Sequence, residues 1–206
     1  MRLRTKRDLT MHNAITTIVA ALTLSAMAAA QTAEPLFDPV RGYRIAHYRG
    51  VVGPAPEGVA RIDTTQAFRL WRRKAAIFID VNPAPGAVRD AATGRWTLAE
   101  PHSSIPGAHW FPESGRGQLA QGIAPWLLDG VRRLHRAAPD RPVVIFCLAD
   151  CWMSWNAALR LHREGYRDIR WFAEGIDGWR DAGLRLEPAA CVGMCASRRK
   201  NRGIRR

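Results

Sequence analysis

The sequence lacks an apolar stretch long enough to span a membrane comfortably, and it contains no internal repeat. Its apolar run at residues 14–24 is short, follows several basic residues and precedes Ala28-Ala29-Ala30. A basic segment, a short apolar segment and small residues in this order are typical of a secretory signal, with cleavage expected after Ala30. We therefore expect residues 1–30 to be a signal peptide and the remaining chain to be periplasmic, with no membrane span.

Acidic residues are scarce: 18 stand against 31 lysines and arginines, which gives a formal net charge of +13. Much of this excess falls within the signal and within residues 198–206, where six residues are basic. The part between has no pronounced basic bias, so the composition does not favour a nucleic-acid partner. We expect an extended arm at residues 31–60, one α/β domain at residues 61–188 and a cysteine-containing basic tail at residues 189–206, of which residues 198–206 are expected to be disordered.

Cysteine is limited to four residues, all of them beyond the signal: Cys147, Cys151, Cys191 and Cys195. In an oxidising compartment they could form up to two disulfides, in any of three pairings. The segment Cys191-Val192-Gly193-Met194-Cys195 lacks the histidine of a haem-attachment motif. A local disulfide is therefore favoured over a site for copper(I) or a haem-linked metal, and we predict no metal ligand and no cofactor.

The segment from Pro142 to Asn156 organises the chain. Residues 143–146 are an apolar run typical of a buried parallel strand, and the residues after Trp152 have helical spacing that ends at Gly165. Cys147 is therefore expected at the carboxyl end of a strand, facing the amino end of a helix. Unpaired N–H groups and the helix dipole there favour a thiolate and can hold an anion, so Cys147 is the candidate nucleophile. The alternative is a small buried residue at a strand end.

Other segments predict how this unit is embedded. The patterns predict strands at residues 75–81, 107–111, 143–146 and 169–172. They predict helices after Asp63, near Pro125, after Trp152 and at residues 175–182. Gln66 completes a capping box with Asp63. Residues 82–106 show no periodicity and are expected to be a long connection. Strands that alternate with helices predict an α/β fold with a central parallel sheet and helices on both faces. Ligands bind at the carboxyl ends of such strands, where Cys147 is expected.

Several motifs resemble a rhodanese domain: Asp80 after an apolar strand, Ile105-Pro106-Gly107-Ala108, the strand that ends in Cys147, and Glu174-Gly175-Ile176-Asp177-Gly178-Trp179. The eleven residues from Cys147 to Ala157 are similar to exported CXXCW-motif proteins associated with pyrroloquinoline-quinone-dependent (PQQ-dependent) catabolism. This resemblance implies a rhodanese-like α/β fold and a role near periplasmic alcohol oxidation by quinoproteins. Rhodaneses carry a persulfide on the cysteine in the position of Cys147.

The loop also departs from a rhodanese loop. A rhodanese usually presents an arginine about five residues after its cysteine, where this chain has Trp152 or Met153. The loop of this chain is also about one residue longer than a rhodanese loop. Asn82 stands where an arginine is common, two residues beyond Asp80. Asp150 adds negative charge, which opposes both a thiolate and an anionic donor such as thiosulfate. These departures weaken the prediction of simple thiosulfate sulfur transfer.

Cys151 permits another chemistry, because a bent loop can bring it within disulfide distance of Cys147. The pair could then cycle by exchange or clear a persulfide, with Cys147 attacking and Cys151 resolving, or it could be a static brace. The residues predicted to bind substrate are Leu148, Ala149, Asp150, Trp152, Met153 and Asp80. We predict sulfurtransferase-type thiol, disulfide or persulfide chemistry on a small sulfur or thiol substrate. The alternative is a non-catalytic binding or assembly module for a periplasmic quinoprotein or cytochrome partner.

Overall fold

The computed structural model describes residues 34–193 and the backbone of Cys195 and Ala196. The chain divides into two units, Met1–Pro35 and Leu36–Arg206, and the first lies almost entirely outside the described residues. The expected signal peptide and most of the expected basic tail also lie outside them. Within the described part of the chain, no helix is both long enough and apolar enough to cross a membrane.

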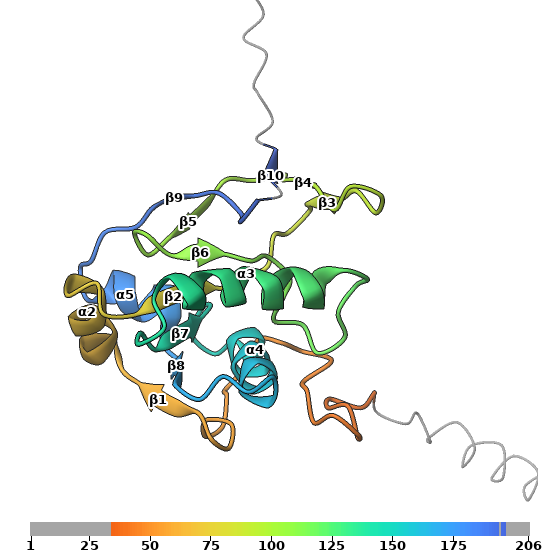
Figure 1. The fold of residues 1–206 in the computed structure, drawn as a ribbon. Coiled ribbons are helices and arrows are strands. Elements are labelled where there is room, and N and C mark those ends of the chain that lie inside the picture. Colours follow the sequence, from red (N-terminus) through yellow and green to blue (C-terminus); the bar gives the residue numbers. More distant parts are fainter. Residues whose placement is uncertain (1–33, 194, 197–206) are drawn as a thin grey trace, which may run out of the picture. The chain divides into compact units, whose positions relative to one another are not determined.

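A parallel sheet of five strands forms the centre of the unit Leu36–Arg206 (Figure 1). Its spatial order is β1-β8-β7-β2-β6, and each neighbouring pair is parallel. The strands are β1 (Ala60–Ile62), β2 (Ile77–Asp80), β6 (His109–Trp110), β7 (Val143–Phe146) and β8 (Ile169–Phe172). Every residue of β2 and β7 is buried, as expected for the middle of a sheet covered on both faces. The predicted α/β fold with a central parallel sheet is therefore confirmed.

Four helices cover the two faces of this sheet: α2 (Thr64–Arg72), α3 (Ile123–Ala137), α4 (Trp152–Arg163) and α5 (Gly175–Asp181). Side chains alternate along a strand, so neighbouring residues of one strand enter different cores. Ile79 and Ile145 belong to the cluster that contains residues of α3 and α4. Phe78 and Phe146 belong to the cluster that contains residues of α2 and α5. The structure thus has helices on both faces, as the sequence predicts.

Local signals in the sequence place the helix ends. Asp63 and Gln66 form the expected capping box at the start of α2, with hydrogen bonds of 2.7 and 2.9 Å. Helix α4 ends at Arg163 and is capped by Glu164. Gly165 follows with φ of 92°, the left-handed conformation that glycine adopts at low cost. Helix α3 begins two residues before Pro125, so this proline lies within the first turn rather than at its first position.

The segment at residues 82–106 differs from the prediction, because it contains short strands. They are β3 (Val88–Arg89), β4 (Trp96–Thr97) and β5 (His102–Ser104). Strand β5 pairs antiparallel with β9 (Glu187–Ala189), and β4 pairs with both β3 and β10 (Cys195–Ala196). These strands are two or three residues long, and two of the partners are distant in sequence, so no periodic pattern marks them.

Candidate dithiol site

The two cysteines of the central segment lie on the connection from β7 to α4. Cys147 directly follows β7, and Cys151 is the residue that precedes the first turn of α4. Helix α5 holds this loop in place: the Cys147 carbonyl accepts the Ile176 N–H at 2.8 Å, and Asp177 accepts the Ala149 N–H at 3.0 Å. Gly175 passes so close that a Cβ there would lie 2.0 Å from the Cys147 carbonyl oxygen. The loop is therefore fixed by backbone contacts that only a glycine permits.

Both thiols are free and buried. Cys147 is 0% exposed and Cys151 is 3% exposed. The Cys147 sulfur lies 3.1 Å from Ser154 Oγ, 3.4 Å from the Ser154 N and 3.4 Å from the Cys151 carbonyl oxygen. The loop thus bends back far enough for the Cys151 carbonyl to contact Cys147, and the side chains of the two cysteines interact. Cys191 is disulfide-bonded, in accord with a disulfide in the carboxyl-terminal segment, whereas the side chain of Cys195 lies outside the described residues.

The environment drives the acidities of the two thiols apart. Burial, followed by hydrogen bonding and charge interaction with Cys151, raises the pKa of Cys147 well above its usual value. The hydrogen bond from Cys147 lowers the pKa of Cys151 to about 7, against the opposing effect of burial; the Met153 N–H and the charge of Arg49 assist. The sequence predicts the thiolate at Cys147, whereas these shifts favour Cys151 as the thiolate. The main causes are the burial of Cys147 and the hydrogen bond that it donates to Cys151. The first turn of α4 serves both thiols, because the Ser154 N lies 3.4 Å from the Cys147 sulfur.

Residues 36–59 of the expected arm pair with this loop. The Tyr48 carbonyl accepts the Trp152 N–H, and the Asp150 carbonyl accepts the Gly50 N–H, each at 2.8 Å. Arg49 and Cys151 pair between these bonds as an antiparallel bridge. The arm therefore joins the cysteine loop as a short strand would, and this pairing contributes to the burial of Cys151.

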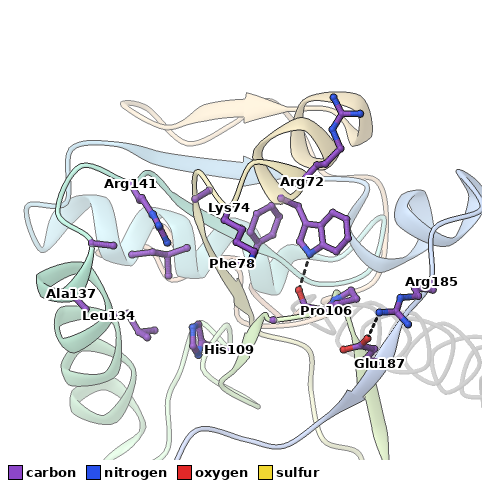
Figure 2. Close-up of a pocket in the computed structure, with 15 residues that line it drawn as sticks. Arg72, Lys74, Phe78, Pro106, His109, Leu134, Ala137, Arg141, Arg185 and Glu187 are labelled. Atoms are coloured by element: carbon purple, nitrogen blue, oxygen red, sulfur yellow. Dashed lines mark hydrogen bonds and ion pairs between the residues drawn. The ribbon is translucent and has the colours of Figure 1, made fainter.

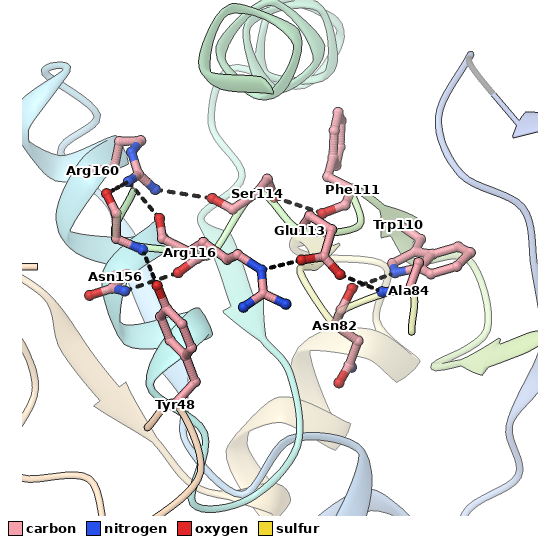
Figure 3. Close-up of polar contacts among 12 residues, drawn as sticks. Tyr48, Asn82, Ala84, Trp110, Phe111, Glu113, Ser114, Arg116, Asn156 and Arg160 are labelled. Atoms are coloured by element: carbon pink, nitrogen blue, oxygen red, sulfur yellow. Dashed lines mark hydrogen bonds and ion pairs between the residues drawn. The ribbon is translucent and has the colours of Figure 1, made fainter. Parts of the chain in front are cut away.

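A polar network ties the arm and the loop at residues 113–117 to α4 (Figure 3). The centre of the network is Arg160, which is 7% exposed. Its guanidinium donates to the Ser114 carbonyl at 3.0 Å and to the Arg116 carbonyl at 2.9 Å. The same guanidinium lies 4.5 Å from the centroid of the Tyr43 ring. Asn156 accepts the Arg44 N–H at 2.9 Å and donates to the Gly115 carbonyl at 3.0 Å. Burial lowers the pKa of Arg160. Sequence spacing places Asn156 and Arg160 on one helix face but does not reveal what that face contacts.

Asp80 ends β2 next to the cysteine loop, since it pairs in register with Phe146. Its buried carboxylate accepts the Asn82 N–H and side-chain amide at 2.8 Å each. The other carboxylate oxygen contacts His102 Nε2 at 2.7 Å and accepts the Ser104 hydroxyl at 2.5 Å. These contacts make Asp80 an anchor for the strand end and for β5.

The other residues predicted to bind substrate surround the two sulfurs to different depths. Leu148, Ala149 and Trp152 are half-buried, Asp150 is exposed, and Met153 is buried. Trp152 also contacts the arm, with its ring centroid 5.2 Å from that of Phe37. A role of these residues in binding substrate stays a prediction. Across residues 34–193, no cluster of three or more histidine, cysteine or acidic side chains could hold a metal ion.

The fold and the site define a parallel α/β domain with a free dithiol at the carboxyl edge of its sheet. No protein-family model matches the chain, and a comparison with curated proteins finds no match. Among solved structures, the chain is similar to a polysulfide-sulfur transferase homodimer from Wolinella succinogenes, at 17% identity and a TM-score of 0.40 over 72% of this chain and 85% of that one.

Two further structures are similar at the same level. A protein from Lactobacillus plantarum shares 17% identity, with a TM-score of 0.41 over 63% of this chain and 88% of that one. EanB, solved in complex with hercynine, shares 19% identity with a TM-score of 0.43. That match covers 63% of this chain and 27% of EanB. At such identities the likeness concerns the fold.

Proposed function

We propose that this chain is an exported, rhodanese-like protein that carries out thiol–disulfide or persulfide chemistry with Cys147 and Cys151. The observation that carries the proposal is the pair of free, interacting thiols whose pKa values are driven apart. An attacking thiol works best when its pKa lies near the ambient pH, as that of Cys151 does. Cys147 stays protonated beside it as a second thiol that can react once a mixed disulfide has formed.

We assign the first attack to Cys151. Its thiolate attacks one sulfur of a small disulfide, the substrate S–S bond breaks, and the departing thiolate takes up a proton. The Cys147 thiol then loses its proton and attacks the Cys151 sulfur, which releases the second substrate thiol and leaves a Cys147–Cys151 disulfide. The substrate is reduced to two thiols and the pair is oxidised, and a dithiol reductant restores the pair. The raised pKa of Cys147 and the lowered pKa of Cys151 favour this order over the reverse order expected from the sequence.

The same two steps clear a persulfide. Cys151 takes the outer sulfur of a substrate persulfide and releases the substrate thiol. Cys147 then attacks the inner sulfur, so that hydrosulfide leaves and the pair becomes a disulfide. The signal-like residues 1–30 support export, and the CXXCW-like segment supports service to quinoprotein-dependent alcohol catabolism in the periplasm.

A second candidate is a non-catalytic binding or assembly module for a quinoprotein or cytochrome. The observation that favours it is the cover over both sulfurs, since a thiol that never meets solvent does not react. In that case the arm and the cysteine loop would be one preformed surface. Substitutions on this surface would then abolish co-purification with the partner, and the oxidation state of the thiols would have no effect.

Intact-mass spectrometry of the protein with Cys147 and Cys151 reduced and the disulfide of Cys191 intact distinguishes the two. After treatment with oxidised glutathione, the wild-type chain should lose the mass of two hydrogen atoms, whereas Cys147→Ser should retain one glutathione on Cys151. Cys151→Ser is the matched control and should react far more slowly. Modification of Cys147 alone would reverse the proposed order. An unchanged mass in all three proteins would exclude the dithiol chemistry and leave the binding module.

A further inference from the structure

A cavity of about 740 Å³ lies at the amino-terminal edge of the sheet, beyond the opposite ends of the strands from the dithiol (Figure 2). Ile77 at the start of β2, Gly107 ahead of β6 and Arg141 ahead of β7 line it. Cys147 follows the other end of β7. The volume lies within the range of roughly 300–1,000 Å³ that is usual for small-molecule sites. The cavity therefore needs an explanation separate from the thiol chemistry.

Much of the wall is apolar. Trp71, Phe78 and Leu134 contribute large side chains, and Pro106 and Ala138 complete the surface. The Trp71 indole N–H already donates to the Pro106 carbonyl at 2.8 Å. Its polar atom is therefore satisfied. Phe68 stacks on the ring and Trp179 makes an edge contact with it, so the ring is held in place where it lines the cavity as an apolar wall. Such a wall suits a planar aromatic body.

The rim carries a surplus of positive charge. Arg72, Lys74, Arg141 and Arg185 line the cavity from separate segments, and all four are exposed. Glu187 is the acidic lining residue, and it is ion-paired to Arg185 at 2.7 Å. Figure 2 shows Arg141 and Arg185 on opposite sides of the cavity. A ligand that bears acidic groups would complement this rim, whereas a neutral one would leave the cations without a counter-charge.

Lys74 is an independent sign that the charge matters. It follows the end of α2 with φ of 51°. The Lys74 N–H donates to the Trp71 carbonyl and the Ala75 N–H donates to the Leu70 carbonyl, each at 2.9 Å. Glycine is the usual residue at this left-handed position, because other side chains are strained there. The chain thus has a lysine in place of the usual glycine at a left-handed position that lines the cavity.

We infer that this cavity binds a small planar aromatic anion, whose ring packs on Trp71 and whose carboxylate or sulfonate groups pair with Lys74 and Arg141. The inference goes beyond the dithiol chemistry and does not depend on it. The apolar wall selects the shape of the ligand and the basic rim selects its charge, so the two contributions can be tested separately.

The probe is naphthalene-2,6-dicarboxylate, titrated into the reduced full chain and followed by calorimetry and by tryptophan fluorescence. We expect saturable one-to-one binding, and at least about tenfold weaker binding of the neutral diol of the same shape, naphthalene-2,6-dimethanol. Arg141→Glu should weaken binding of the dicarboxylate at least about tenfold. Lys74→Gly should weaken it roughly fivefold and raise the melting temperature, because glycine relieves the strain.

The matched control is Arg73→Glu, which makes the same charge change next to Arg72 but lines a different surface, with Arg69 and Arg170. Its affinity should stay within about twofold of the parent. Ala137→Trp should block the cavity without changing its charge, and abolish binding while the protein still melts cooperatively. Equal affinity for the diol, equal losses in Arg73→Glu and Arg141→Glu, or parental binding by Ala137→Trp would each overturn the inference. The glutathione reaction should be unchanged in every variant, so a failure here leaves the proposed function untouched.

Discussion

Cys147 Sγ lies 3.1 Å from Ser154 Oγ, and this hydroxyl also accepts the Trp171 indole N–H at 3.0 Å. The Ser154 hydroxyl proton is directed to the Cys151 carbonyl at 3.3 Å. The Ser154 hydroxyl and N–H both lower the pKa of Cys147, against the larger effect of burial. When Cys147 loses its proton, the hydroxyl can turn and donate to the thiolate. Ser154 is thus placed to stabilise the thiolate of the resolving cysteine.

Ser154→Ala should destabilise the fold and slow resolution. It leaves the Trp171 N–H buried without its acceptor, which costs about 1–3 kcal/mol in urea unfolding. The hydroxyl also lowers the pKa of Cys147 against the larger effect of burial, so its loss should make the mixed disulfide on Cys151 last longer. Ser103→Ala, at an exposed serine of β5, is the control and should change the free energy of unfolding by less than about 0.5 kcal/mol. Equal effects in the two variants would contradict this role.

Alkylation of Cys151 should follow a titration with its midpoint at about pH 7. An ordinary cysteine titrates at about 8.5, so the rate should approach its plateau already by about pH 8. Peptide mass mapping after brief treatment with iodoacetamide at a series of pH values measures the rate at Cys151. Arg49→Glu should move the midpoint upward, because the positive charge of Arg49 favours the thiolate. A midpoint that stays near that of an ordinary cysteine would refute the assignment.

The same pKa difference predicts a pH-dependent stability. The pKa of Cys151 is lower in the folded chain than its reference value of 9.0, so its stabilising contribution is complete above that value and is lost as pH falls through about 7. Cys147 acts in the opposite sense, because its raised pKa penalises the folded state as pH rises above the reference value. Urea unfolding of the reduced protein between pH 6 and 9 should therefore lose part of its pH dependence in Cys151→Ser. An unchanged pH profile would contradict the prediction.

Trp155→Phe should loosen the arm. The Trp155 indole N–H donates to the Pro54 carbonyl at 2.9 Å, and phenylalanine keeps an aromatic ring but loses this bond. A loss of about 1 kcal/mol would raise the open population, and with it the alkylation rate of Cys151, roughly fivefold. The alkylation assay at a fixed pH measures this change. If the rate stays at the parental value, the arm does not control access to the thiols.

Gly175→Ala should disrupt the cysteine loop. Gly175 has φ of 53°, and an added Cβ would overlap the Cys147 carbonyl oxygen, so we expect a loss of about 2–4 kcal/mol. Gly183→Ala is the matched control: φ is 72° there, but no heavy atom lies within 4 Å of the added Cβ. Backbone strain alone should cost it about 1 kcal/mol. Urea unfolding compares the two, and equal losses would mean that the contact with Cys147 is unimportant.

The elements that the sequence predicts best are those defined by local signals. The strand at residues 143–146, the capping box of Asp63 and Gln66, and the helix end at Gly165 each depend on neighbours within a few positions. The apolar runs of β2 and β7 likewise predict strands that are buried on both faces, and alternate residues of each strand enter the two cores. These features suffice for the fold class and for the position of the two cysteines.

The parts that sequence patterns miss depend on contacts between distant residues. The pairing of the arm with the cysteine loop joins Gly50 to Asp150, and the Arg160 network joins α4 to a loop more than forty positions earlier. Which cysteine forms the thiolate depends in turn on burial and on this cover. A periodic pattern in one segment contains no information on its distant partner.

The long sequence separation of the arm contacts has a consequence for how the chain folds. The bonds from Arg44 to Asn156 and from Trp155 to Pro54 span 112 and 101 positions. Contacts of such separation carry a large loop-closure entropy and form after the local helices. A newly made chain therefore forms its local helices while the cysteine loop still lacks the arm, and Cys151 can be oxidised or modified before the arm pairs with this loop.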